Sequence, residues 1–215
     1  MDVAGFKGGM TVGLRNWVRN RLLDCAMRQM NDLRPATLAE TRGEVLEVGF
    51  GTGLNLEHYP GTVESLSGLD PNPATDLPAV EERVRAARFP VERFDLPADH
   101  GLPFDSGRFD TVVTTWTLCS IPDPLEALRE MRRVLSPNGC YVFIEHGKAP
   151  TASTARWQDR IDPLWTRISD GCHLNRPIDR LVEEADFEVS SLERFRQPGP
   201  GILAHMYRGV AKRSG

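Results

Sequence analysis

The sequence has no apolar run that approaches the ~18 residues needed for a membrane-spanning helix, so we expect no transmembrane anchor. Its first ten residues, MDVAGFKGGM, also lack the charged-then-apolar order of a secretory signal peptide. There is no basic excess either, because 26 Lys and Arg stand against 30 Asp and Glu, for a net charge of −4. Without that excess we expect no nucleic-acid partner.

Cysteine is scarce, and its spacing matches no common site. The four cysteines, Cys25, Cys119, Cys140 and Cys172, include no C-x-x-C pair. This spacing gives neither a disulfide framework nor a zinc signature. We therefore expect a reducing, cytoplasmic location and no bound metal ion.

The 215 residues, of which 40% are hydrophobic, are enough for one well-packed domain spanning residues 1–215. Short apolar runs predict strands at residues 45–50, 66–70, 91–95, 109–118 and 140–145. Segments with helical periodicity alternate with these strands. The alternation predicts a doubly wound α/β fold, in which helices cover both faces of a mostly parallel sheet.

The pattern changes after residue 148. Two predicted helices, at residues 151–170 and 177–185, precede two alternating strands at 188–195 and 202–210. A short turn rich in proline and glycine joins these strands, which predicts an antiparallel hairpin at the edge of the sheet. The hairpin brings the predicted sheet to seven strands, and we expect residues 148–215 to shape the substrate site.

The N-terminal segment, residues 1–42, carries a helical pattern of apolar residues before the first strand. Its first 34 residues hold six basic and three acidic side chains, a charge of +3, so the remainder carries −7. One interpretation is a helix packed on the domain. The alternatives are a lid over a pocket and a weak contact with a membrane surface.

Three glycines alternate directly after the first predicted strand, in the sequence Glu47-Val-Gly49-Phe-Gly51-Thr-Gly53. Glycines at these positions let the backbone turn tightly and approach a ligand with no Cβ in between. Asp70 ends the second strand, 19 positions after Gly51, where an acid can accept hydrogen bonds from ribose hydroxyls. The alternative is a simple glycine turn beside a surface aspartate.

The dinucleotide fingerprint G-x-G-x-x-G would need a glycine at position 54, where the sequence has Leu54, so a nicotinamide cofactor is disfavoured. The pattern E-x-G-x-G-x-G instead resembles motif I of class I S-adenosylmethionine (SAM) methyltransferases, in the broad family that contains ubiquinone and menaquinone methyltransferases. The resemblance continues through Gly68-Leu-Asp70, Arg93-Phe-Asp95 and the stretch 129–139, and covers residues 43–147. It implies a Rossmann-like methyltransferase fold with SAM as cofactor.

By this resemblance, the motif I residues surround the methionine part of SAM; they are Glu47, Gly49, Gly51 and Gly53. Asp70 would hold the ribose.

The adenosine side follows from the same resemblance. Pro71 and Asn72 would lie against the adenosine, and Asp95 would accept a hydrogen bond from the adenine amino group. The backbone N–H of Leu96 would reach a ring nitrogen, and Thr115 would sit near the sulfonium.

The C-terminal half is similar to animal methyltransferase-like enzymes that methylate small alkyl thiols. The residues that carry the similarity lie at 143–146, around Trp157 and Trp165, and at 171–176. The function implied is methyl transfer from SAM to a small-molecule acceptor, most concretely a thiol. The alternatives are an N-, O- or C-methyltransferase for a lipid, quinone or secondary metabolite, and a non-catalytic SAM-binding scaffold.

Three polar residues are candidates for acceptor chemistry. His146 and Glu145 end the fifth strand, where a neutral imidazole can take a proton from an acceptor and a carboxylate can orient it. His173 is a second candidate base. The alternatives are a His146 that caps the loop, a Glu145 that is an ordinary loop acid, and a Cys172–His173 pair that is buried and hydrogen-bonded.

Overall fold

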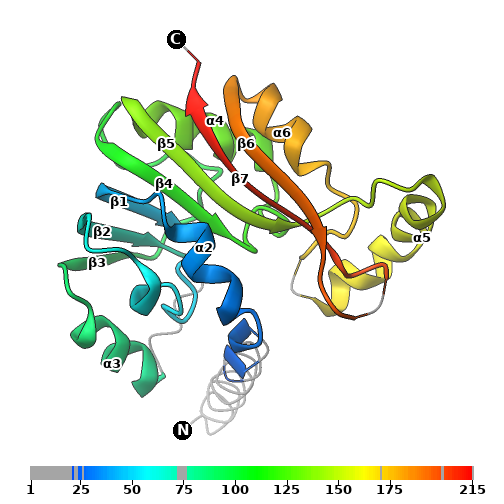
Figure 1. Ribbon diagram of the computed structural model, residues 1–215, viewed down its shortest axis with the longest axis horizontal. Helices are drawn as coiled ribbons and strands as arrows, with labels where there is room; N and C mark the ends of the chain where they lie inside the picture. The colour runs from blue at the N-terminus through cyan, green and yellow to red at the C-terminus, as the bar shows by residue number, and fades with distance from the viewer. Residues whose placement is uncertain are drawn as a thin grey trace, which may run out of the picture.

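The computed structural model describes residues 21, 24–25, 27–71, 77–169, 171–199 and 201–214. Its centre is a seven-stranded sheet with the order β3-β2-β1-β4-β5-β7-β6 (Figure 1). The strands are β1 (Gly43–Val48), β2 (Val63–Leu69), β3 (Val91–Phe94), β4 (Phe109–Thr115), β5 (Leu135–His146), β6 (Phe187–Arg196) and β7 (His205–Arg213).

Strands β1 to β5 pair in parallel, whereas β7 is antiparallel to both β5 and β6. The predicted mostly parallel sheet with an antiparallel edge hairpin is therefore confirmed. The chain order reverses between β1 and β4, which are neighbours in the sheet. The carboxyl ends of strands at such a switch point are where open α/β sheets bind ligands.

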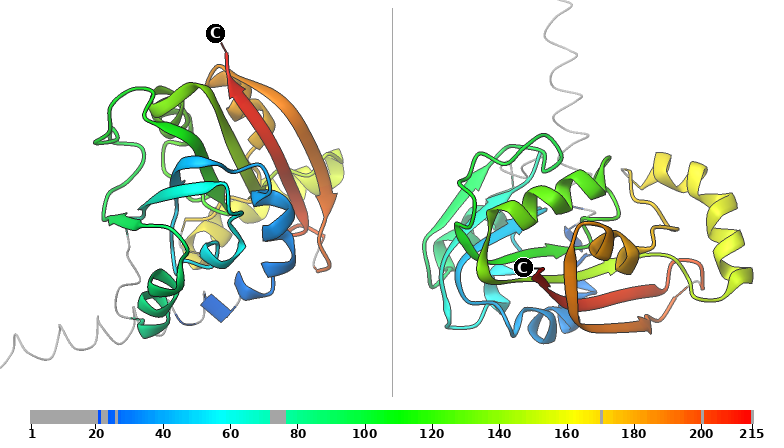
Figure 2. Two further views of the ribbon diagram at one scale, coloured as in Figure 1. Left: turned by 60° about the vertical axis from the view of Figure 1, so that its left-hand side comes forward. Right: turned by 90° about the horizontal axis from the view of Figure 1, so that it is seen from above.

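Helices cover both faces of the sheet, as predicted (Figure 2). One face carries η1 (Asn31–Leu33), α2 (Arg34–Leu38), η2 (Leu56–His58) and α3 (Pro78–Ala86), and the other carries α4 (Pro124–Val134) and α6 (Ile178–Glu184). Successive side chains of β5 point to opposite faces of the sheet, so β5 contacts both helical layers. Val142 packs on the α2 side and Phe143 on the α4 side. Both side chains are fully buried.

Helix α5 (Ala152–Ile168) extends beyond the end of the sheet, near the loop that joins β6 and β7 (Figure 1). The fully buried side chain of Gln158 anchors it. Its Nε2 donates to the carbonyls of Gly147 (3.1 Å) and Ile202 (3.0 Å), and its Oε1 accepts from the amide of Ala149 (2.7 Å). This polar clamp joins the helix to the end of β5 and to the hairpin loop.

The fifth strand begins at Leu135, five residues before the strand predicted at 140–145, and it includes the turn-forming residues 136–139, Ser-Pro-Asn-Gly. Leu135 pairs with Phe109 and Cys140 pairs with Thr111, so five steps along β5 oppose two steps along β4. The turn residues thus form a bulge inside the strand. A Cβ at Gly139 would lie 2.6 Å from Leu135 Cδ1, which explains why the bulge closes on a glycine.

Most of the predicted N-terminal helix lies outside the described residues, and so does its interpretation as a membrane-surface contact. The described part includes Asp24, whose carboxylate pairs with Arg83 of α3 at 2.8 Å. Within the described ranges, we find no helix that is both long and apolar enough to cross a bilayer.

Candidate functional site

A cavity of about 300 Å³ opens at the carboxyl ends of β1, β2 and β4, within the size range of small-molecule sites. Seven of the predicted cofactor residues line it: Glu47, Gly49, Gly51, Asp70, Pro71, Leu96 and Thr115. Gly53 is not among the lining residues. Asp95 lines a smaller adjoining cavity with Gly51 and Asp70, and Asn72 lies outside the described residues.

The loop after β1 needs glycine at two of these positions. Gly49 has φ +84, and a Cβ there would lie 1.9 Å from Thr117 Oγ1, so no larger residue fits. Gly51 has φ +53, and its amide donates to Asp70 Oδ2 at 2.8 Å. A Cβ at Gly51 would meet no atom nearer than 4.0 Å, so the loop leaves open space where a ligand can approach the backbone.

A buried carboxylate forms one wall of the cavity. Glu47 is 1% exposed, and it accepts hydrogen bonds from Asn55 Nδ2 and from the hydroxyl of Tyr59, both at 2.8 Å. Burial raises the pKa of Glu47 to about 7, although these hydrogen bonds and the nearby Arg34 oppose the rise. An acid in this position suits a ligand that carries positive charge.

The N-terminal segment contributes Arg34 to the same wall. This residue is 3% exposed, and its Nη1 donates to Asn55 Oδ1 at 2.5 Å. Its guanidinium also stacks over the ring of Trp116, with 4.9 Å to the ring centroid. Arg34 therefore connects the acidic wall to the turn that follows β4.

Trp116 begins that turn in a backbone conformation that non-glycine residues rarely adopt, with φ +53. Its amide donates to the carbonyl of Ile144 at 2.8 Å, which holds the residue in place. Strained residues of this kind cluster at functional sites. Trp116 lines the cavity, as do Ser120 and Ser169.

These residues fit SAM. The glycine loop leaves backbone exposed to the ligand, and two carboxylates, Glu47 and Asp70, face a cavity with apolar walls such as Leu54 and Ile121. SAM carries a sulfonium and an ammonium group, so acidic walls suit it.

The three predicted catalytic residues are not among the lining residues of this cavity in the described chain. Glu145 is fully buried, and it accepts a hydrogen bond from the amide of Thr117 at 3.2 Å. His146 is 8% exposed, and its Nδ1 lies 3.9 Å from Cys172 Sγ. Their catalytic roles stay predictions.

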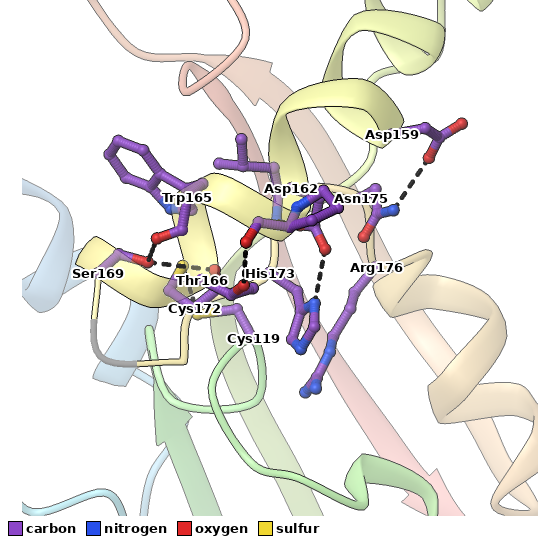
Figure 3. A network of polar contacts seen from close by, with 12 residues as sticks. Cys119, Asp159, Asp162, Trp165, Thr166, Ser169, Cys172, His173, Asn175 and Arg176 are labelled. Carbon is purple, nitrogen blue, oxygen red and sulfur yellow. Dashed lines mark hydrogen bonds and ion pairs between the residues drawn. The ribbon is translucent and has the colours of Figure 1, made fainter.

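His173 follows Cys172 in the loop after α5 (Figure 3). Its Nδ1 lies 2.8 Å from Asp162 Oδ2, and its amide donates to the carbonyl of Cys119, also at 2.8 Å. The carboxylate orients the imidazole, while the backbone bond joins this loop to the turn after β4. Within the described residues, no cluster of three or more His, Cys, Asp or Glu is arranged to hold a metal ion.

The burial of Glu145 gives a testable pH dependence. Desolvation raises its pKa from the ordinary 4.5 to about 7, so between these values the folded chain keeps a proton that the unfolded chain loses. Stability should therefore fall as the pH rises through this window, by up to about 1.4 kcal/mol per pH unit. Glu145→Gln, which cannot ionise, is expected to match the wild type below pH 4.5 and to be more stable above pH 7, measured by urea unfolding. A difference in the free energy of unfolding between Glu145→Gln and the wild type that does not change with pH would contradict this assignment of the Glu145 pKa.

Sequence reasoning missed two residues that shape the site, namely Arg34 and Asn55. Asn55 follows the glycine motif by two positions and interrupts an apolar stretch, which is a usable signal for a buried polar group. Arg34 carries no such signal, because only the folded chain brings its guanidinium over the ring of Trp116.

Comparisons with known proteins agree with this geometry. A family model described as "Methyltransferase domain" matches residues 46–143. The human thiol S-methyltransferase TMT1B is 35% identical over 184 residues, which cover 84% of this chain and 74% of the relative. The human thiol S-methyltransferase TMT1A is 34% identical over 156 residues, which cover 72% of this chain and 64% of the relative.

A solved structure of a SAM-dependent methyltransferase from Methanosarcina mazei matches with a TM-score of 0.58. The match covers 79% of this chain and 92% of that one at 20% identity, so it supports the fold alone. The cavity and the sequence relatives together show that this chain belongs to the SAM-dependent methyltransferase family that includes TMT1A and TMT1B.

Proposed function

We propose that this enzyme transfers the methyl group of SAM to the sulfur of a small-molecule thiol. The observation that carries the proposal is the 35% identity to a human thiol S-methyltransferase over 84% of the chain. The cavity supports it, because Trp116, Ser120 and Ser169 are among its lining residues and would border an acceptor placed beyond the sulfonium.

SAM supplies an activated methyl group, so the task of the protein is mainly positioning and desolvation. In the proposed arrangement Asp70 accepts hydrogen bonds from the ribose, and the glycine loop of Gly49 and Gly51 faces the methionine part. Glu47 offsets the positive charge, while Asp95 and Leu96 contact the adenine. The hydrogen bond from Gly51 to Asp70 supports this assignment, because it fixes the carboxylate at the cavity wall.

A thiol reacts as its thiolate, and an ordinary thiol has a pKa of about 8.5, so a modest base is enough. We propose His146 and His173 as the candidate bases, with Glu145 orienting the acceptor. His173 has the better orientation, since Asp162 holds its Nδ1. For either histidine to act, the acceptor must bind on the side of Ser120 and Ser169.

We also propose that residues 1–215 form one domain, with residues 1–42 as a lid, 43–147 as the SAM-binding half and 148–215 as the substrate-shaping part. Met27 and Arg34 line the cavity, and Arg83 joins Asp24 to the carbonyl of Thr52 in the glycine loop, which supports the lid. A cytoplasmic location is part of the same proposal.

The test is methyl transfer from labelled SAM to a panel of alkyl thiols, with amines and phenols of the same carbon skeleton as matched acceptors. We expect transfer to the thiols at least ten-fold faster than to their nitrogen or oxygen counterparts. Transfer confined to amines, phenols or carbon acceptors would contradict the thiol assignment. SAM binding without transfer to any acceptor would favour a scaffold.

A further inference from the structure

Two cysteines that are far apart in the sequence meet beside the cavity. Cys119 lies in the turn after β4 and Cys172 in the loop after α5, and their Sγ atoms are 3.5 Å apart. Figure 3 shows Cys172, in the loop after α5, next to Cys119 of the turn after β4. Neither participates in the proposed methyl transfer.

The fold imposes this approach through backbone contacts on both sides of the pair. The amide of His173 donates to the carbonyl of Cys119 at 2.8 Å, and Ser169 Oγ donates to the carbonyl of Cys172 at 3.2 Å. Arg176 adds a third contact, with its Nη1 donating to the carbonyl of Ile121 at 2.7 Å. The two sulfur atoms are therefore held at a distance from which a small movement can form a disulfide.

The two thiols differ in access and in charge. Cys119 is 2% exposed, whereas Cys172 is partly exposed to solvent. The hydrogen bond between the two thiols and the neighbouring His146 lower the pKa of Cys172 to about 5, while the same hydrogen bond and burial raise the pKa of Cys119. The accessible sulfur is thus the nucleophilic thiolate, and the buried sulfur keeps its proton.

We propose that Cys172 and Cys119 form a redox-active dithiol that exchanges with small-molecule disulfides at the rim of the cavity. The position fits this role, because Ser120, next to Cys119, and Ser169, three residues before Cys172, both line the cavity. Cys25 and Cys140 do not share this arrangement: Cys25 is exposed, and Cys140 lies beside Arg42.

The exchange is balanced with a disulfide RSSR as the oxidant. The Cys172 thiolate attacks one sulfur of RSSR, the S–S bond breaks, and RS⁻ leaves. Cys119 then gives its proton to this RS⁻ and attacks the Cys172 sulfur, so that a second RS⁻ leaves and a Cys119–Cys172 disulfide forms. The dithiol passes two electrons to RSSR, which is released as one RSH and one RS⁻.

The released thiol emerges beside the part of the cavity that we assign to the acceptor. The exchange would therefore convert a small disulfide into a methyl acceptor in place. This last step rests on the proposed thiol methylation, whereas the exchange itself does not.

The experiment uses the reduced, desalted full chain and one equivalent of bis(2-hydroxyethyl) disulfide, with released thiol and peptide masses as readouts. For the wild type we expect two equivalents of 2-mercaptoethanol per chain, a fall from four free cysteines to two, and a Cys119–Cys172 cross-linked peptide. Cys119→Ala should release one equivalent and keep the adduct on Cys172, and Cys172→Ser should release none at this site. Cys140→Ala, which removes another buried thiol, should behave as the wild type.

A stable adduct on wild-type Cys172 without a cross-link, or an adduct that forms as fast on Cys25, would overturn the proposal. A second arm adds SAM and no reductant, and compares the disulfide with free 2-mercaptoethanol. Methylated product from both supports the exchange and its coupling to methylation. Released thiol without methylation, even when the free thiol is supplied, leaves the exchange standing and refutes the proposed acceptor.

Discussion

Gly51→Val should raise the Kd for SAM at least 100-fold, or about 2.7 kcal/mol, while the chain stays folded. Gly51 has φ +53, which a β-branched residue adopts only with strain, and its Cβ would project into the open space of the cavity. The new side chain would also disturb the hydrogen bond from this amide to Asp70 Oδ2. Calorimetric titration of SAM measures the change.

Gly101→Val is the matched control for this variant. Gly101 has φ +86, and a Cβ there also meets nothing within 4 Å, but the residue is exposed and is not a lining residue of the cavity. It therefore carries the same kind of backbone strain without the obstruction. We expect SAM affinity within about two-fold of the wild type. Equal losses of SAM affinity in both variants would mean that backbone strain, rather than blocked space in the cavity, governs SAM binding.

Arg34→Ala should lower the free energy of unfolding by about 2–4 kcal/mol and weaken SAM binding as well. The truncation leaves Asn55 Oδ1 buried without its 2.5 Å donor and removes the guanidinium stacked over Trp116. It also removes a positive charge that lowers the pKa of Glu47, so this carboxyl should hold its proton to a higher pH. A protonated Glu47 no longer offsets the charge of SAM.

Urea unfolding and calorimetry at pH 7 test this prediction, with Arg28→Ala as the control. Arg28 lies in the same N-terminal segment and pairs with Asp24, but its side chain is 55% exposed. Arg28→Ala should therefore lower the free energy of unfolding by less than about 1 kcal/mol. If both variants lowered the free energy of unfolding and the SAM affinity by equally small amounts, Arg34 would have no special part in the cavity wall.

Local sequence patterns were enough to predict most of the fold. The alternation of strands and helices predicted the seven-stranded sheet, and the turn signal at residues 197–201 predicted the edge hairpin. The strand predicted at 140–145 begins five residues too late, because the turn-forming residues 136–139 lie inside β5. A turn-forming sequence is equally compatible with a bulge, and the pairing of Leu135 with Phe109 decides for the bulge.

The site likewise has a part that the sequence could predict and a part that it could not. The position of Glu47, Gly49, Gly51 and Asp70 at the cavity could be predicted, because they stand at the carboxyl ends of two neighbouring parallel strands, β1 and β2. The environment of Glu145 and His146 could not, because it depends on the turn after β4 folding over the end of β5. The amide of Thr117 then reaches Glu145, and Cys172 reaches His146 from a loop 26 residues further along the chain.

A crystal structure of the chain with S-adenosylhomocysteine tests the central claim most directly. We predict the ligand in the 300 Å³ cavity, with its ribose hydroxyls on Asp70 and its sulfur facing Trp116 and Thr115. The space beyond the sulfur should be bounded by Ser120 and Ser169. A ligand bound elsewhere, or a ribose out of reach of Asp70, would contradict the account.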